Sequence, residues 1–114
     1  MITIYHNPRC GKSRQTLALI EEAGQEPQVI EYLKTPPTAT ELDSLLQKLK
    51  MEPRELMRKG EEIYRELKLA EKKLSRDEAI ELMIAHPKLI ERPIVVKGKQ
   101  AVLGRPPENV NSLL

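Results

Sequence analysis

The chain contains no phenylalanine and no tryptophan, and only three tyrosines among its 114 residues. Its core must therefore be built from Leu, Ile, Val and Met. A single cysteine is present, which cannot form an internal disulfide and fits a reducing compartment, so we expect a cytoplasmic protein. A chain of this length can bury roughly two thirds of its unfolded surface, so folding needs neither disulfides nor metal.

Long apolar runs and an excess of one charge are also missing. No apolar segment approaches the roughly 18 residues of a membrane span, and the N-terminal residues lack the pattern of a signal peptide. Nineteen basic residues against seventeen acidic ones leave a net charge of +2, which does not indicate binding to nucleic acid or an anionic membrane. We expect one soluble domain over residues 1–114, with no nucleic-acid or membrane partner.

The predicted elements follow the order βαβ, helical insert, ββα. Strands are expected at residues 2–6, 29–33, 93–96 and 100–103, and helices at residues 13–23 and 108–114. Between these halves, about residues 38–86 form a helical insert, in which Thr38 with Glu41 and Ser75 with Glu78 are expected to form capping boxes. This order predicts an α/β fold with a mixed sheet of about four strands.

The lone cysteine lies in the segment Asn7-Pro8-Arg9-Cys10-Gly11-Lys12-Ser13-Arg14. A nucleotide-binding P-loop ending here would need glycine at position 6, where the chain has His6. Cys10 falls at the first strand-to-helix turn, where the unpaired N–H groups of a helix favour a thiolate. Nearby cations would lower its pKa further, and the local candidates are Arg9, Lys12, Arg14 and a protonated His6. We therefore predict that Cys10 is a nucleophile.

Plainer explanations remain open for this segment. A cysteine can be a small buried apolar side chain, although no apolar stripe includes position 10. Ser13 stands where a redox C-x-x-C motif has its second cysteine. Reduction of an oxidised form of Cys10 would therefore require a thiol from another molecule. The Ser13 hydroxyl can hydrogen-bond the Cys10 sulfur, or it can cap or line the first helical turn.

Three further arginines are candidates for binding an oxyanion: Arg58, Arg92 and Arg105. Guanidinium groups hold tetrahedral anions through paired N–H···O bonds. Arg92 and Arg105 each precede a proline, which keeps their backbone extended, and they flank the predicted hairpin, so both can lie in one neighbourhood of the sheet. The alternative for each is an ordinary solvated surface arginine.

Six motifs follow one another along nearly the whole chain, at residues 5–14 (YHNPRCGKSR), 32–38 (YLKTPPT), 55–59 (ELMRK), 86–87 (HP), 92–96 (RPIVV) and 104–106 (GRP). Together they resemble the glutaredoxin-linked arsenate reductase family, in particular its short chromosomal branch. That family has a thioredoxin-like fold with a helical insert, which agrees with the element order predicted above. The resemblance thus implies a single thioredoxin-like arsenate reductase domain.

The resemblance also implies roles for individual residues. Cys10 matches the nucleophile that forms a thioarsenate intermediate, and the three arginines named above match those that hold the oxyanion and its reduced products. His6 matches a histidine that influences the thiol, although a lone histidine can equally be structural. Pro93 resembles the cis-proline that thioredoxin-like folds place beside the active thiol. Ser13 and Arg14 complete the predicted surroundings of the sulfur.

The function implied is reduction of arsenate to arsenite, with glutathione as co-substrate and glutaredoxin as partner. No metal or bound organic cofactor is implied, and phosphate or sulfate would be mimics of the substrate. A glutathione-dependent thiol reductase without an arsenic role would also use Cys10, but it would give the three candidate oxyanion-binding arginines no function. A non-catalytic RNA-polymerase-binding regulator of the same superfamily (Spx type) usually switches through a C-x-x-C pair, which Ser13 removes.

Overall fold

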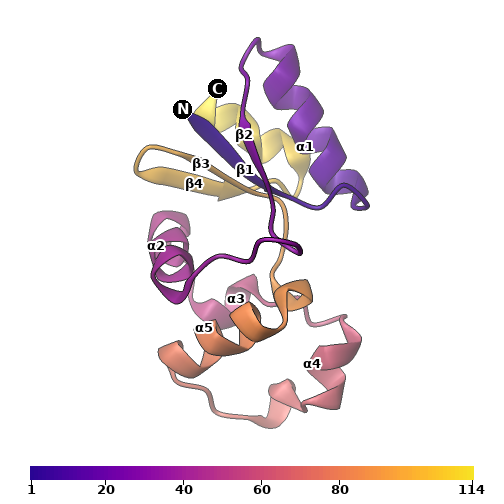
Figure 1. The fold of residues 1–114 in the computed structure, drawn as a ribbon, viewed down its shortest axis with the longest axis vertical. Helices are drawn as coiled ribbons and strands as arrows, with labels where there is room; N and C mark the ends of the chain where they lie inside the picture. Colours follow the sequence, from indigo (N-terminus) through magenta and orange to yellow (C-terminus); the bar gives the residue numbers. More distant parts are fainter. The chain divides into compact units, whose positions relative to one another are not determined.

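The computed structural model describes residues 1–114, and the chain divides into two compact units (Figure 1). The first unit comprises residues 1–35 and 92–114, and the second comprises residues 36–91. The first contains β1 (Ile2–His6), α1 (Gly11–Glu22), β2 (Gln28–Glu31), β3 (Ile94–Lys97), β4 (Gln100–Leu103) and the 3₁₀ helix η3 (Pro107–Leu113). The predicted insert falls inside the second unit, and the single-domain organisation stays a prediction.

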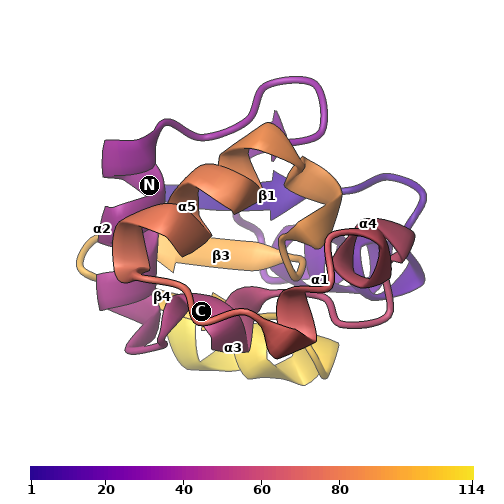
Figure 2. The ribbon, with the colours of Figure 1, turned by 90° about the horizontal axis from the view of Figure 1, so that it is seen from below.

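The first unit is built on one mixed sheet with the strand order β2-β1-β3-β4. Strands β1 and β2 are parallel, whereas β1 with β3 and β3 with β4 are antiparallel; Figure 2 shows β1 and β3 pointing in opposite directions. The βαβ and ββα halves therefore meet in one sheet of four strands, which confirms the predicted fold class.

The register of the strands brings three chain segments to one end of the sheet. Tyr5 pairs with Ile94, and Ile94 pairs with Leu103. The carboxyl end of β1, the amino end of β3 and the carboxyl end of β4 consequently coincide. Residues that follow β1, precede β3 or follow β4 are thereby collected at this end.

An aliphatic core holds α1 and η3 against the sheet. Every second residue of β1 is buried, as alternation along a strand requires. The buried core residues are Ile2, Ile4, Ile20, Val95, Val110 and Leu113, with Leu17, Leu19 and Val102 packed around them. In Figure 1, α1 and η3 lie next to each other, in agreement with their many contacts. Branched aliphatic side chains thus fill this core in the absence of Phe and Trp.

Two boundaries differ from the prediction by two residues. Helix α1 begins at Gly11, because Cys10 already serves as its N-cap, and it ends before Gly24, whose φ of 80° only glycine adopts readily. Strand β2 ends at Glu31 instead of continuing to residue 33. The Glu31 carbonyl accepts hydrogen bonds from the N–H groups of Lys34 and Thr35, so the chain turns there. The predicted end of this strand was therefore wrong.

The second unit is helical. It contains α2 (Ala39–Leu49), α3 (Pro53–Leu56), α4 (Glu62–Glu66), η1 (Leu69–Glu71), α5 (Arg76–Ala85) and η2 (Pro87–Leu89). Both predicted capping boxes are present, at the starts of α2 and α5. Its buried side chains include Leu42, Leu46, Leu56, Leu69, Ile80 and Met83. None of the helices in the chain combines the length and the apolar character needed to cross a membrane.

Candidate active site

The loop between β1 and α1 holds the thiol at the start of the helix. Cys10 is the N-cap residue, with extended backbone angles (φ −96°, ψ 122°), and its carbonyl accepts the first helical hydrogen bond from Arg14 N at 3.0 Å. Its own N–H donates to the Asn7 carbonyl at 3.0 Å. The cysteine is free and half-buried. Its sulfur therefore combines partial solvent access with a position at the positive end of a helix.

A buried hydrogen-bond network fixes the shape of this loop. The Ser13 Oγ accepts the Asn7 N–H at 3.1 Å and lies 2.6 Å from His6 Nδ1. Ser13 is fully buried, and His6 and Asn7 are nearly so. The Asn7 Oδ1 accepts the N–H of Arg9 at 3.0 Å, which closes the turn. The loop is thus held from inside, while Cys10 remains accessible.

Two of the predicted arginines lie beside the sulfur. Nη1 of Arg105 is 3.9 Å from Cys10 Sγ and donates to the carbonyl oxygen of Arg92 at 3.3 Å. The side chain of Arg92 also hydrogen-bonds the Cys10 sulfur. Both arginines are half-buried. They come from the two ends of the β3–β4 hairpin, at the end of the sheet where β1 enters the cysteine loop.

These neighbours favour the anionic form of the thiol. Burial by itself would raise the pKa of Cys10. The Ser13 N–H, the hydrogen bond and positive charge of Arg92, and the Lys12 N–H outweigh burial, so the pKa of Cys10 lies below its ordinary value. The lowered pKa favours the thiolate form, and the role of Cys10 as a nucleophile stays a prediction.

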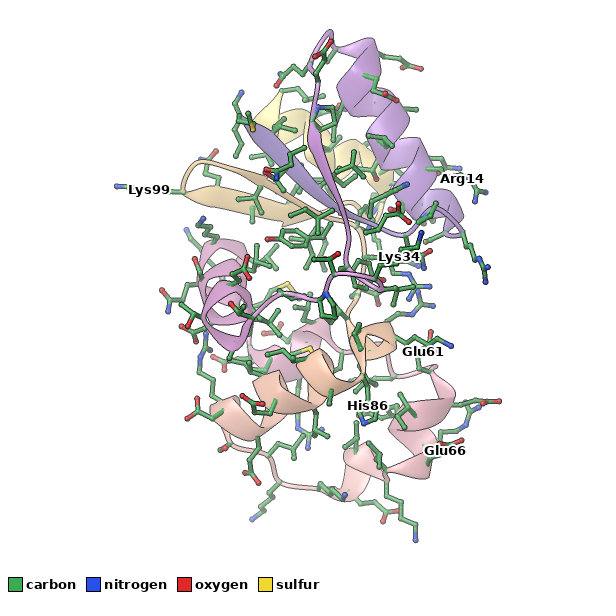
Figure 3. The ribbon with its side chains drawn as sticks, in the orientation of Figure 1. Arg14, Lys34, Glu61, Glu66, His86 and Lys99 are labelled. Carbon is green, nitrogen blue, oxygen red and sulfur yellow. The ribbon has the colours of Figure 1, made fainter.

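Other predicted neighbours act differently. Burial lowers the pKa of His6 in spite of Glu31, so His6 is not a cation beside the thiol at neutral pH. The hydroxyl of Ser13 bonds within the loop, and it is its backbone N–H that reaches the sulfur. The guanidinium of Arg14 donates to the Pro8 carbonyl at 3.0 Å, and Figure 3 shows Arg14 extending outward from α1.

Pro93 is buried, and the Arg92–Pro93 peptide bond is cis, as the resemblance implies. The Arg105–Pro106 bond is cis as well, which the sequence did not indicate.

Arg58 belongs to the second unit, where it is surrounded by carboxylates. Its guanidinium forms ion pairs with Glu61 at 3.5 Å and Glu91 at 3.7 Å. Its backbone N–H donates to the Leu89 carbonyl at 2.7 Å. Figure 3 labels Glu61, which directly precedes α4. Binding of an oxyanion by Arg58 stays a prediction.

Sequence analysis overlooked Thr16 and Gly104. Thr16 is fully buried in α1, and Gly104, which directly precedes Arg105, packs against Thr16. A weak signal was available, because Gly104 interrupts the chain between an apolar strand and an arginine-proline pair. Their contacts are described below.

The fold and this site define a thioredoxin-like protein with one thiol at the first strand-to-helix turn and two guanidinium groups beside it. Residues 5–113 match the ArsC family, and the chain belongs to this family.

The chain covers most of the length of the relatives that it matches. It is 54% identical over 110 residues to the uncharacterized protein YfgD of Escherichia coli (strain K12), covering 96% of this chain and 92% of that protein. It is 50% identical over 113 residues to the arsenate reductase of the same strain, covering 99% of this chain and 80% of that protein. The solved arsenate reductase from Vibrio cholerae is 54% identical, with a TM-score of 0.95 and coverage of 99% and 97%.

Proposed function

We propose that this protein is an arsenate reductase that converts arsenate to arsenite with glutathione and glutaredoxin as reductants. Membership of the ArsC family and about 50% identity to proteins named arsenate reductase support this reaction. The observation that carries the proposal is the Cys10 thiol, whose pKa is lowered and which has Arg92 and Arg105 beside it. A thiolate and two guanidinium groups together suit a tetrahedral oxyanion that must be both bound and attacked.

In the binding step, Arg92 and Arg105 donate N–H groups to arsenate oxygens, and Arg58 supplies a third guanidinium in the role that the resemblance implies. Their charges offset the repulsion between the anionic substrate and the thiolate. Phosphate and sulfate have the same tetrahedral shape and should compete for the arginines.

In the first chemical step, the Cys10 thiolate forms a sulfur–arsenic bond, and one arsenic–oxygen bond breaks. The departing oxygen takes a proton and leaves as water. Arsenic remains pentavalent at this stage. Glutathione then forms a second sulfur–arsenic bond, and another oxygen leaves as water.

Reduction follows when a glutaredoxin thiolate attacks the glutathione sulfur. The sulfur–arsenic bond to glutathione breaks, and its electron pair stays on arsenic, which becomes trivalent. The two sulfurs are oxidised to a mixed disulfide between glutaredoxin and glutathione. Water then displaces the Cys10 sulfur, so arsenite leaves and the thiol is restored. No second cysteine of this chain takes part, consistent with its single cysteine.

A coupled assay with arsenate, glutathione, glutaredoxin and its NADPH-dependent reductase tests the proposal. We expect NADPH oxidation that depends on arsenate in the native protein and no turnover in Cys10→Ser. Arg9→Met is a matched control, because it changes an exposed neighbour of Cys10. Equal rates for the native and Cys10→Ser proteins, or no turnover by either, would contradict the proposal.

The same assay separates the alternative functions. A glutathione-dependent thiol reductase would reduce a mixed disulfide through Cys10 without any arsenate-dependent turnover. An RNA-polymerase-binding regulator would be retained by polymerase and would show no turnover with either substrate. The cytoplasm supplies the reduced glutathione that the proposed reaction consumes, so we propose it as the location.

A further inference from the structure

We propose that Thr16 and Gly104 are positioning residues that hold the Arg105 guanidinium beside the Cys10 sulfur. The identity of the anion that Arg105 binds depends on the proposed function. The packing that positions Arg105 does not depend on it. Neither residue reaches the sulfur. Both would act through the end of β4, from which Arg105 extends.

The first observation is that Gly104 leaves no room for a side chain. A Cβ added there would lie 2.4 Å from Thr16 Oγ1, 2.7 Å from Pro93 Cγ and 2.9 Å from Thr16 Cγ2. These distances are far shorter than ordinary non-bonded contacts. Gly104 does not have a positive φ, unlike Gly24 and Gly98. Glycine is therefore needed at position 104 for close approach and not for its backbone conformation.

The second observation is that hydrogen bonds tie the same residue to both of its neighbours. The N–H of Gly104 donates to the Pro93 carbonyl at 2.9 Å. Thr16 is fully buried, and its hydroxyl lies 2.8 Å from the Lys12 carbonyl and 3.4 Å from the Gly104 carbonyl, both of which can accept its proton. The end of β4 is thus fixed to the start of β3 on one side and to the first turns of α1 on the other.

This junction sets the distance between Arg105 and Cys10. Cys10 caps the helix that carries Thr16, and Arg105 follows Gly104 directly. Nη1 of Arg105 is 3.9 Å from the sulfur, which is near the limit of a hydrogen bond to sulfur. To relieve the closest contact of an added Cβ, β4 and α1 would have to separate by about 1 Å, a displacement that can lower catalysis by roughly 100-fold when it misplaces a reacting group.

The experiment compares four variants: Gly104→Ala, Thr16→Ala, the double variant, and Gly60→Ala as a matched control. Around Gly60 an added Cβ meets nothing within 4 Å. For each variant we would measure the rate of Cys10 alkylation by iodoacetamide against pH, the protection from alkylation by arsenate, and KM and kcat in the coupled assay.

In Gly104→Ala we expect the arsenate concentration for half-protection to rise about tenfold, because a charged hydrogen bond from Arg105 to the oxyanion is weakened. KM should rise by a similar factor. The alkylation profile should stay close to native, because the groups that lower the pKa of Cys10 belong to Ser13, Arg92 and Lys12. The double variant should recover part of the loss, because Thr16→Ala removes both contacts with Thr16 and leaves only the contact with the Pro93 ring. Gly60→Ala should behave like the native protein.

A folded Gly104→Ala protein with native protection by arsenate would overturn the proposal, and so would a double variant no better than Gly104→Ala. If Gly104→Ala does not fold, Thr16→Val decides, because it keeps the bulk of threonine and removes only the hydroxyl. Native behaviour of Thr16→Val would then count against the proposal. Absence of arsenate turnover in the native protein would refute the proposed reaction, while protection of Cys10 from alkylation by arsenate would still test the positioning.

Discussion

The Arg105 guanidinium lies 3.9 Å from the Cys10 sulfur, although 95 positions separate the two residues in the chain. The contact arises because β3 runs antiparallel to both β1 and β4, so that the end of β4 returns to the end of β1. A thiol at a helix N-terminus thereby gains cations that are remote in the sequence.

Replacing Arg92 by methionine should raise the pKa of Cys10, because the variant lacks both the charge and the hydrogen bond to the sulfur. Only the thiolate reacts with iodoacetamide, so the alkylation profile should shift to higher pH and the rate at neutral pH should fall. Arg9→Met is the control, since Arg9 is adjacent in sequence but is not among the groups that lower this pKa. A larger shift in Arg9→Met than in Arg92→Met would contradict the geometry.

Replacing Ser13 by alanine should destabilise the protein and leave the thiol nearly unchanged. The substitution removes the partner of the buried Asn7 N–H and of His6 Nδ1, which should cost about 1–3 kcal/mol in the free energy of unfolding. The backbone N–H that reaches Cys10 is retained. Urea denaturation and the alkylation profile measure the two effects separately. Ser112→Ala, at an exposed serine, is the control and should change stability little.

The pH dependence of stability should reveal the neutral state of His6. Its pKa is lower in the folded protein than the ordinary value of about 6.5, chiefly because of burial. The unfolded chain therefore binds a proton at His6 more readily, and the free energy of unfolding should fall as the pH drops below about 6.5 towards the folded pKa. Denaturation curves measured between about pH 5 and 8 test this. The decline should be shallower in His6→Gln and should persist in His86→Gln, and equal slopes in all three proteins would refute it.

Replacing Arg58 by lysine tests the oxyanion-binding role of the remaining arginine. We expect KM for arsenate to rise several-fold, because lysine cannot bind an oxyanion with paired N–H groups. The alkylation profile of Cys10 should stay native, since the groups that lower its pKa all belong to the first unit. Arg65→Lys is the matched control on an exposed arginine of α4. An unchanged KM would contradict the oxyanion-binding role and would indicate that Arg58 acts only through its ion pairs with Glu61 and Glu91.

Local patterns in the sequence predicted much of the fold correctly. Both capping boxes form, because a serine or threonine three positions before glutamate satisfies helix N–H groups without help from distant residues. The predicted end of β2 was wrong. The apolar residues after Glu31 suggest that the strand continues, but the chain turns there, with hydrogen bonds to the Glu31 carbonyl.

The site was predicted less completely, because its electrostatics depend on register. Sequence proximity pointed to Arg9 and Lys12 as the cations near the thiol, whereas Arg92 supplies the charge, and Lys12 contributes its N–H. His6 was a candidate cation, yet burial keeps it neutral. Thr16 lies in no motif, and although Gly104 belongs to the GRP motif at residues 104–106, only the packing of β4 on α1 shows the contact between the two residues.

By itself, the sequence determined where the helices and most strands lie and that the only thiol lies at the first strand-to-helix turn, because capping, periodicity and proline act over a few residues. The tertiary structure decided which charges face that thiol. Strand pairing joins segments separated by most of the chain, and the distances between them follow from how closely the backbone at Gly104 approaches the helix.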